Sequence, residues 1–206
     1  IGGQFINAGP GFGGSCFKKD ILSLIYLCNF YRLDEVAKYW ENVININNWQ
    51  QERISSLIVE KLFGTVVGKK IAIFGFAFKA NTNDTRESPA IEISLDLLSE
   101  NANLVFHDPK VTFKQISSEL EKKQNSEIIK SKISYSEDIT DASKDADAII
   151  IITEWDIYKK INWQKIAKLM RKPSWVFDAR GIIDIEDVKA SGINIWQVGN
   201  GYAARN

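Results

Sequence analysis

The sequence predicts an α/β protein in which a helical segment precedes a doubly wound, mostly parallel sheet. Two observations carry this prediction. Segments of helical periodicity fill the first third of the chain, and from Lys69 onward short apolar runs alternate with segments long enough for helices. Near-continuous apolar strands are typical of a parallel sheet that helices cover on both faces, and right-handed crossovers wind such a sheet in both directions.

The helical segment is expected to hold two helices. The first runs from about Phe17 to Tyr31 with Ser15 as its candidate N-cap, and the second from about Glu35 to Phe63 with Asp34 as its candidate N-cap. The second would be on the order of 40 Å long, so we expect it to connect domains or subunits. Its polar middle is either a solvated stretch or a set of amides lining an interface, and it comprises Asn45, Asn47, Asn48, Gln50 and Gln51.

The rest of the chain divides into predicted strands and helices. The strands are Ile71 to Phe76, Leu104 to His107, Ile133 to Tyr135, Ala148 to Ile152, Trp175 to Phe177 and Ile193 to Val198. The helices between them are Ala90 to Glu100, Thr112 to Lys130, Asp138 to Lys144 and Trp163 to Arg171. We therefore expect a helical segment over residues 1–65 and a sheet domain over residues 66–206.

Composition excludes several classes of protein. Lys and Arg together number 26, as do Asp and Glu, so the chain lacks the charge of a nucleic-acid binder. Two cysteines and no run approaching eighteen apolar residues favour a cytoplasmic protein that neither spans nor binds a membrane. The chain begins with Ile and carries no secretory signal, so we expect it to be a fragment or a processed product. We expect no metal site.

A glycine-rich loop delivers Cys16 to the start of the first helix. Four glycines lie between Gly9 and Gly14, and they let the backbone adopt positive φ and approach a bound group closely. The helix N-terminus and the neighbouring Lys18 and Lys19 both favour the thiolate over the thiol. The alternative is a turn that happens to carry a cysteine. Cys28 lies in the apolar pattern of its helix and is expected to be inert packing.

The segment after the first predicted strand carries two cations. It is not the G-x-G-x-x-G of a dinucleotide site, because only Gly75 is present. Lys79 and Arg86 precede a helix whose start, Ser88-Pro89, combines a serine cap with a proline at the first position. A phosphate-bearing ligand suits such a helix start. The alternative is a solvated loop whose charges pair locally.

Three polar residues end other predicted strands. Asp108 closes the second strand, where nucleotide-binding folds often place an acid for ribose hydroxyls. His107 is the only histidine, and no motif surrounds it, which disfavours a cysteine hydrolase because that chemistry pairs the thiol with a histidine base. Arg180 follows the fifth strand and could reach an anion. A lone histidine at a strand end is more often structural than catalytic, and the segment of Arg180 could equally be ordinary loop chemistry.

Four motifs resemble the UDP-glucose/GDP-mannose dehydrogenase family, the nucleotide-sugar 6-dehydrogenases. They are Gly11-Phe12-Gly13-Gly14-Ser15-Cys16-Phe17 with Lys19-Asp20; Gly75-Phe76-Ala77-Phe78-Lys79 with Asp84-Thr85-Arg86-Glu87-Ser88; Thr153-Glu154-Trp155; and Phe177-Asp178 with Arg180. Their order and spacing match the family along nearly the whole chain. The resemblance implies a central dimerisation segment over residues 1–65 and a Rossmann-like domain that binds the nucleotide sugar over residues 66–206. The family's N-terminal NAD-binding domain is absent from this sequence.

The resemblance also implies a reaction. UDP-glucose is the best-matched substrate, with GDP-mannose or UDP-N-acetylmannosamine as alternatives, and a non-catalytic nucleotide-binding or dimerisation module as a further one. Two NAD⁺ would oxidise the C6 alcohol to a carboxylate through a thiohemiacetal and a thioester on Cys16. Asp20, one helical turn along, would help to position or activate the hydrolytic water.

Further site residues are implied by the same resemblance. Those matching substrate contacts are Asn7, Gly9, Pro10, Gly11, Phe12, Gly13, Phe78, Lys79 and Arg180. Those matching the cofactor side are Cys16, Phe17, Lys18 and Lys19 near the nicotinamide, and Arg86 at the pyrophosphate. The family's catalytic lysine and NAD fingerprint would lie upstream of residue 1. We therefore expect a homodimer or higher oligomer, and no oxidation of UDP-glucose by these 206 residues alone.

Overall fold

The computed structural model describes residues 2–200, so the first residue and the last six of the predicted sheet domain lie outside the described residues. Six strands form one sheet: β1 (Lys70–Phe74), β2 (Asn103–His107), β3 (Ile133–Tyr135), β4 (Ala148–Ile151), β5 (Trp175–Asp178) and β6 (Asn194–Gln197). Every pairing is parallel. All six predicted strands and the α/β class are confirmed.

The strand order β3-β2-β1-β4-β5-β6 is that of the Rossmann fold. The chain leaves β1 toward β2 and β3, and leaves β4 toward β5 and β6, so the winding reverses between β1 and β4. Ligands of open α/β sheets bind at such a reversal, outside the carboxyl ends of the strands. The fold therefore directs attention to the loops that follow β1 and β4.

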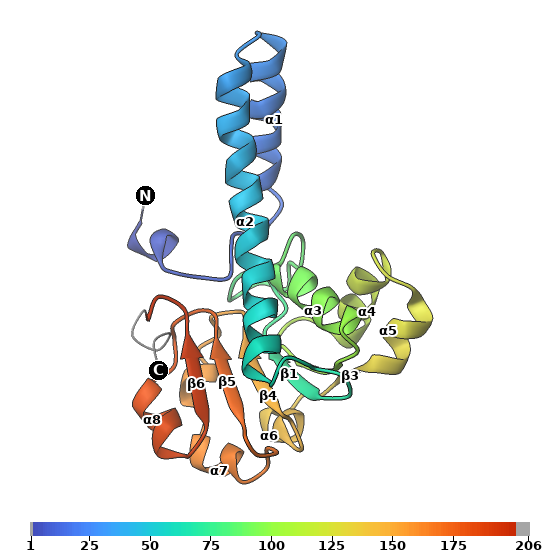
Figure 1. The fold of residues 1–206 in the computed structure, drawn as a ribbon, viewed down its shortest axis with the longest axis vertical. Helices are drawn as coiled ribbons and strands as arrows, with labels where there is room; N and C mark the ends of the chain where they lie inside the picture. The colour runs from blue at the N-terminus through green and yellow to red at the C-terminus, as the bar shows by residue number, and fades with distance from the viewer. Residues whose placement is uncertain (1, 201–206) are drawn as a thin grey trace.

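Two helices project from the sheet as a hairpin (Figure 1). They are α1 (Phe17–Phe30) and α2 (Asp34–Lys61), and α2 continues down to pack against α3 (Pro89–Ser99). The remaining helices are α4 (Phe113–Glu121), α5 (Ser126–Lys132), α6 (Ile139–Ser143), α7 (Trp163–Ala167) and α8 (Ile185–Ala190), with 3₁₀ turns at Gly3–Ile6 (η1) and Tyr158–Lys160 (η2). The predicted long helix is confirmed.

Two of the predicted helix caps are wrong and one is right. The N-cap of α1 is Cys16 rather than Ser15, because Gly14 turns with φ +84° and its N–H is held by Arg86, so the helix begins later. The N-cap of α2 is Leu33, whose carbonyl accepts the first helical bonds and leaves Asp34 inside the first turn. Ser88 caps α3 as predicted, accepting the Ala90 N–H at 3.3 Å.

The segment from Thr112 to Lys130, expected as one helix, forms two. α4 ends at Glu121, and Asn125 caps a new helix by accepting the Glu127 N–H at 2.9 Å. The short helix α8 was not predicted. Its N-cap is Asp184, which accepts the N–H groups of Glu186 and Asp187. Short capped helices carry too few turns to show a clear apolar period.

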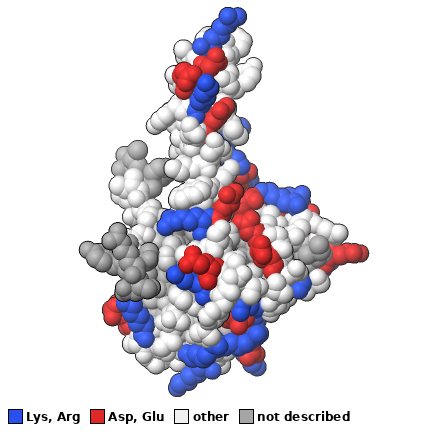
Figure 2. Space-filling model, in the orientation of Figure 1, with Lys and Arg blue, Asp and Glu red and all other residues white. Residues whose placement is uncertain are grey.

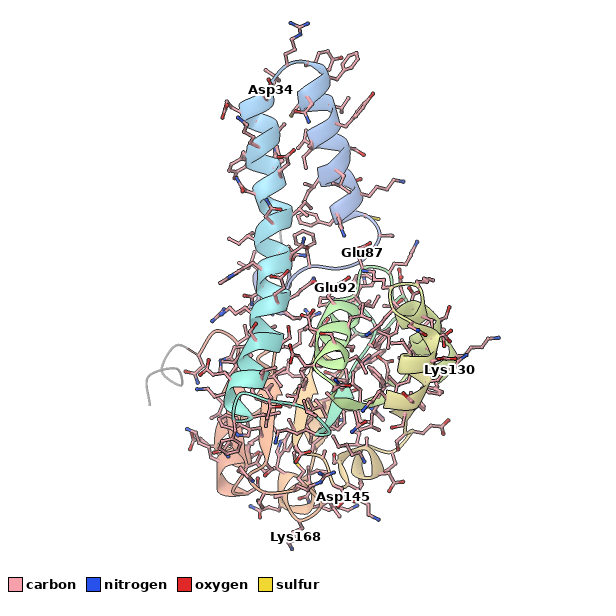
Figure 3. All side chains as sticks on the ribbon, turned by 45° about the vertical axis from the view of Figure 1, so that its right-hand side comes forward. Asp34, Glu87, Glu92, Lys130, Asp145 and Lys168 are labelled. Carbon is pink, nitrogen blue, oxygen red and sulfur yellow. The ribbon has the colours of Figure 1, made fainter. Side chains whose placement is uncertain are left out.

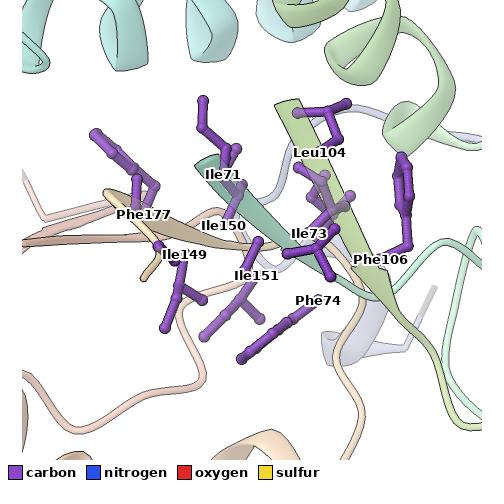
Figure 4. Close-up of a cluster of buried hydrophobic side chains, with 14 of the residues drawn as sticks. Ile71, Ile73, Phe74, Leu104, Phe106, Ile149, Ile150, Ile151 and Phe177 are labelled. Carbon is purple, nitrogen blue, oxygen red and sulfur yellow. The ribbon is translucent and has the colours of Figure 1, made fainter. Parts of the chain in front are cut away.

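The sheet and the second half of α2 share one apolar core (Figure 4). Ile71, Ile73 and Phe74 of β1 are fully buried, and Ile54 and Ile58 of α2 belong to the same cluster. The hairpin has a separate, small cluster made of Ile21, Ile25, Cys28 and Ala37. Cys28 is thus packing, as expected. Because α2 packs in both clusters, the division near residue 65 stays a prediction.

Candidate active site

Three loops meet where the sheet reverses its winding, and Arg180 fastens them together. Its Nε donates to the Ile152 carbonyl at 2.6 Å, after β4, and its Nη2 donates to the Phe78 carbonyl at 3.1 Å, after β1. Nε also lies 3.1 Å from a carboxylate oxygen of Glu154. Burial lowers the pKa of Arg180, which the charges of Glu154 and Asp178 oppose, and a guanidinium stays protonated. Arg180 is therefore a loop anchor as well as a candidate anion contact.

The glycine-rich loop docks onto the β1–α3 loop. The Gly14 N–H donates to the Arg86 carbonyl at 2.9 Å. A Cβ on Gly13 would lie 2.3 Å from the Glu87 carbonyl oxygen, and one on Gly14 would lie 2.9 Å from the Phe78 ring. Lys18 completes the contact through an ion pair with Glu87 at 2.7 Å, and Figure 3 shows Glu87 beside the start of α1. The glycines are required here because side chains would separate the two loops.

The polar middle of α2 holds the other side of the same loop. The Asn47 side chain accepts the Phe12 N–H at 2.7 Å and donates to the Phe12 carbonyl at 3.3 Å. Gln50 donates to the Gly9 carbonyl at 2.9 Å. Asn47 and Gln51 are buried, whereas Asn45 and Asn48 are exposed. Of the two interpretations left open by the sequence, amides lining an interface is correct for Asn47 and Gln50, and the interface lies within the chain.

Cys16 is an exposed free thiol at the N-terminus of α1. Its carbonyl accepts the Asp20 N–H at 2.8 Å, so Asp20 lies one turn along the helix, and it is also exposed. The pKa of Arg86 is raised first by its hydrogen bond to Asp84, with a smaller contribution from Cys16, whose loop bonds to the Arg86 carbonyl through the Gly14 N–H. The structure thus places a thiol, a carboxylate one helical turn away and a cation on the adjoining loop in the same part of the molecule.

The two predicted phosphate-binding cations are both exposed. Arg86 forms a two-point ion pair with Asp84, at 2.9 Å and 2.7 Å, and this pair lowers the pKa of Asp84. Its side chain remains 65% exposed, so local pairing does not remove it from a ligand's reach. Lys79 lies over the Phe78 ring, 5.3 Å from the ring centre. Figure 2 shows both signs of charge mixed over the visible face.

The remaining predicted site residues lie on the glycine-rich loop or on the first turn of α1. Asn7 and Lys19 are exposed, and Pro10 is buried. Gly9 lies against Arg180, since its missing Cβ would be 3.4 Å from Nη1. Phe12 and Phe17 meet edge to face, with ring centres 4.6 Å apart. The residues predicted for the substrate side and those predicted for the cofactor side therefore lie on or beside the same glycine-rich loop.

Asp108 and His107 have structural roles. The Asp108 carboxylate is 3% exposed and accepts five N–H groups, from Phe76, Ala77, Lys110, Val111 and Trp155, so it is not placed for ribose hydroxyls. The Tyr158 hydroxyl donates to the His107 carbonyl at 2.9 Å, so it accepts from His107 Nδ1 at 3.0 Å. Burial lowers the pKa of His107. Neither group faces Cys16 in any contact of the described residues.

A cleft of about 430 Å³ lies between α2, α3 and α4. Phe12, Lys18 and Asn47 border it, but Cys16, Phe78 and Arg180 do not. Three of its carboxylates are paired with lysines, Glu87 with Lys18, Glu92 with Lys123 and Glu119 with Lys122. We therefore locate the candidate site on the Cys16 side of the loop, where the predicted residues gather.

Within residues 2–200, no group of three or more His, Cys, Asp or Glu side chains is arranged to hold a metal ion. Over the same residues, no helix combines the length and apolar character needed to cross a membrane.

Known proteins match both parts of the chain. Residues 1–49 match the central domain of the UDP-glucose/GDP-mannose dehydrogenase family, and residues 72–185 match its UDP-binding domain. UDP-glucose 6-dehydrogenase 1 of Glycine max is 44% identical over 97% of this chain, and UDP-glucose 6-dehydrogenase of Gallus gallus is 44% identical over all of it. The chain spans 44% and 42% of the lengths of these curated relatives.

Solved structures of known proteins share the fold of this chain. A UDP-glucose dehydrogenase from Pyrobaculum islandicum superposes with a TM-score of 0.72 at 26% identity, covering 96% of this chain and 40% of that one. An NDP-N-acetyl-D-galactosaminuronic acid dehydrogenase from Methanosarcina mazei superposes with a TM-score of 0.76 at 21% identity, over 96% of this chain and 40% of that one, which supports the fold alone. With its four motifs, its strand order and both domain matches in agreement, the chain belongs to the UDP-glucose/GDP-mannose dehydrogenase family.

Proposed function

We propose that this chain is the catalytic-cysteine and nucleotide-sugar-binding portion of an NAD-dependent UDP-glucose 6-dehydrogenase. One observation carries the proposal: the exposed thiol of Cys16 begins a helix and is carried on a loop that docks against Arg86, Phe78 and Arg180 at the winding reversal of the sheet. A thiol, cations and glycine-lined backbone in one place suit a sugar carbon linked to a diphosphate.

In the proposed mechanism, the C6 alcohol of the sugar first loses a hydride and a proton and becomes an aldehyde. The Cys16 thiolate then attacks the C6 aldehyde and forms a C–S bond, and the carbonyl oxygen takes up a proton to give a thiohemiacetal. Loss of a hydride and a proton from this adduct gives a thioester. Water then adds to the thioester carbon, the C–S bond breaks, and the carboxylate leaves while the thiol is restored. Asp20, one turn from Cys16, holds the water and takes its proton.

The cofactor NAD⁺ supplies the hydride acceptor when bound. Arg86 fits a role at its pyrophosphate, because the guanidinium is exposed, lies on the loop that holds the Gly14 N–H, and keeps its orientation through Asp84. Phe17, Lys18 and Lys19 follow Cys16 on the first turn of α1, and we assign them to the nicotinamide side of the cofactor. The uracil nucleotide and sugar would contact the loop from Asn7 to Gly13 and the side chains of Phe78, Lys79 and Arg180.

The proposal also includes a homodimer in the cytoplasm. The hairpin exposes large apolar side chains on both helices, among them Tyr26, Phe30, Val36 and Tyr39, and such surfaces mark protein interfaces. An exposed catalytic thiol needs a reducing compartment to stay free.

The experiment compares alkylation of the two cysteines by iodoacetamide, with and without UDP-glucose, using mass spectrometry to separate the sites. We expect rapid labelling of Cys16, slow labelling of buried Cys28, and protection of Cys16 by UDP-glucose of at least tenfold. Calorimetric titration of the same chain with UDP-glucose, GDP-mannose and UDP-N-acetylmannosamine identifies the sugar.

Equal or stronger binding of either alternative sugar would contradict UDP-glucose as the substrate. Binding of all three without protection of Cys16 would support a non-catalytic module. NADH production by the isolated chain, at a rate near that of an intact relative, would contradict the expectation that it needs a further NAD-binding domain.

A further inference from the structure

The side chain of Asn47 holds the backbone of Phe12 at both of its polar groups. Oδ1 accepts the N–H at 2.7 Å, and Nδ2 donates to the carbonyl at 3.3 Å. Asn47 is only 9% exposed, so losing one of these bonds would leave a buried polar group unpaired. An amide is the side chain that can donate and accept at once in this way. The contact thus depends on the residue type as well as on burial.

The loop is shaped to reach this amide. Gly11 has φ +108°, and a Cβ there would lie 2.8 Å from Asn47 Oδ1. Gln50, three residues further along α2, donates to the Gly9 carbonyl at 2.9 Å. Residues three apart lie on the same face of a helix. One face of α2 therefore holds the loop from Gly9 to Phe12 by side chains that the sequence pattern alone left without a role.

The opposite side of the loop is held by backbone. Gly14 donates to the Arg86 carbonyl, and Glu87, whose φ is +52°, presents its carbonyl to Gly13. A positive φ at a glutamate is strained and persists only where the surroundings impose it. Cys16 follows two residues after Gly14, so its position is set by α2 on one side of the loop and by the β1–α3 loop on the other. Of these two elements, α2 is fixed independently, since Ile54 and Ile58 lie in the sheet core.

We propose that Asn47 is a positioning residue for this site, supported by Gln50: it fixes the substrate-side loop between α2 and the β1–α3 loop and so sets where Cys16 meets the nucleotide sugar. This inference rests on the proposed function for its consequence in binding, and on the hydrogen bonds of Asn47 for the positioning itself. Asn47 touches no reacting atom.

The experiment uses the chain with Asn47→Leu, Asn47→Asp and, as a matched control, Asn45→Ala on the exposed part of the same helix. Hydrogen exchange of the backbone amides and calorimetric titration with UDP-glucose are measured for each. Asn47→Leu removes both bonds, whereas Asn47→Asp keeps the acceptor for the Phe12 N–H and loses the donor.

For Asn47→Leu we expect at least tenfold faster exchange at Phe12 and at least tenfold weaker UDP-glucose binding. Asn47→Asp should fall between Asn47→Leu and the parent chain in both measurements, and Asn45→Ala should equal the parent. Exchange in β1 and β4 should be unchanged in every variant.

Unchanged Phe12 exchange in Asn47→Leu would overturn the proposal, as would accelerated exchange throughout the sheet, which would mean a general structural role. Unchanged UDP-glucose binding despite faster Phe12 exchange would also overturn it. If the parent chain binds no UDP-sugar while Phe12 exchange still responds to Asn47→Leu, the proposed function fails and the positioning of the loop stands.

Discussion

The hairpin and the sheet domain differ in how many apolar side chains they bury. The sheet domain buries its strands and the end of α2 in one extended cluster, whereas the hairpin buries only Ile21, Ile25, Cys28 and Ala37. The hairpin also exposes large apolar side chains, with Tyr26 at 68% and Phe30 at 67%. The difference teaches that the sheet domain has an extended core of its own, whereas the hairpin buries little by itself and leaves apolar side chains exposed.

The largest expected effect tests the sheet against the hairpin. Phe74→Ala in β1 removes a fully buried ring and should cost about 3–5 kcal/mol of unfolding free energy. Ile25→Ala in the small hairpin cluster should cost about 2 kcal/mol, the lower end for such a change, because the thin cluster can collapse around the gap. Urea denaturation followed by tryptophan fluorescence measures both. A cost for Ile25→Ala equal to that of Phe74→Ala would break the comparison.

The next effect concerns the exposed face of the hairpin. Tyr26→Ser should weaken self-association roughly a hundredfold, since both protomers lose the ring and burying each ring contributes about 1.5 kcal/mol. Sedimentation velocity across a concentration series measures the dissociation constant. Phe63→Ser serves as the control, because Phe63 is 73% exposed but lies beyond the hairpin. A monomeric parent chain, or equal weakening by Phe63→Ser, would contradict a hairpin dimer.

The smallest effect is a pH dependence that reports on the sheet domain alone. Burial lowers the pKa of His107 in the folded protein, against the nearby charges of Asp108 and Asp138, whereas the unfolded value is about 6.5. As pH falls below about 6.5 the unfolded chain takes up the proton first, so stability declines by at most about 1.4 kcal/mol per pH unit until the folded pKa is reached. The stabilisation is therefore fully present above that range.

His107 is the only histidine, so comparison with His107→Gln isolates this contribution. Urea denaturation at pH 7.5 and 5.5 should show a smaller difference between the two pH values for His107→Gln than for the parent chain. Identical pH dependence in both proteins would show that the buried imidazole does not control acid stability.

Much of the architecture could be predicted because it is local. Strands such as Ile71 to Phe76 and Ala148 to Ile152 are apolar runs, which a strand buried on both faces of a parallel sheet requires. The glycines around Cys16 were also readable, and each fits a close contact of the docked loop. The predicted caps Ser15 and Asp34 were wrong because turns outside each helix set where it starts. At α1 the turn is at Gly14, which the Arg86 carbonyl holds, and at α2 it is at Arg32, which has a positive φ.

The candidate site divides in the same way. The sequence by itself determined the parallel α/β sheet, the long helix, and the presence of Cys16, Asp20, Lys79, Arg86 and Arg180 in family motifs. Only the tertiary structure decided that Asn47 and Gln50 hold the cysteine loop and that Arg180 anchors two loops. It also decided that the Asp108 carboxylate accepts hydrogen bonds from N–H groups of the protein itself. The physical reason is that periodicity records which residues are buried, whereas a hydrogen bond between segments far apart in sequence exists only once the chain has folded.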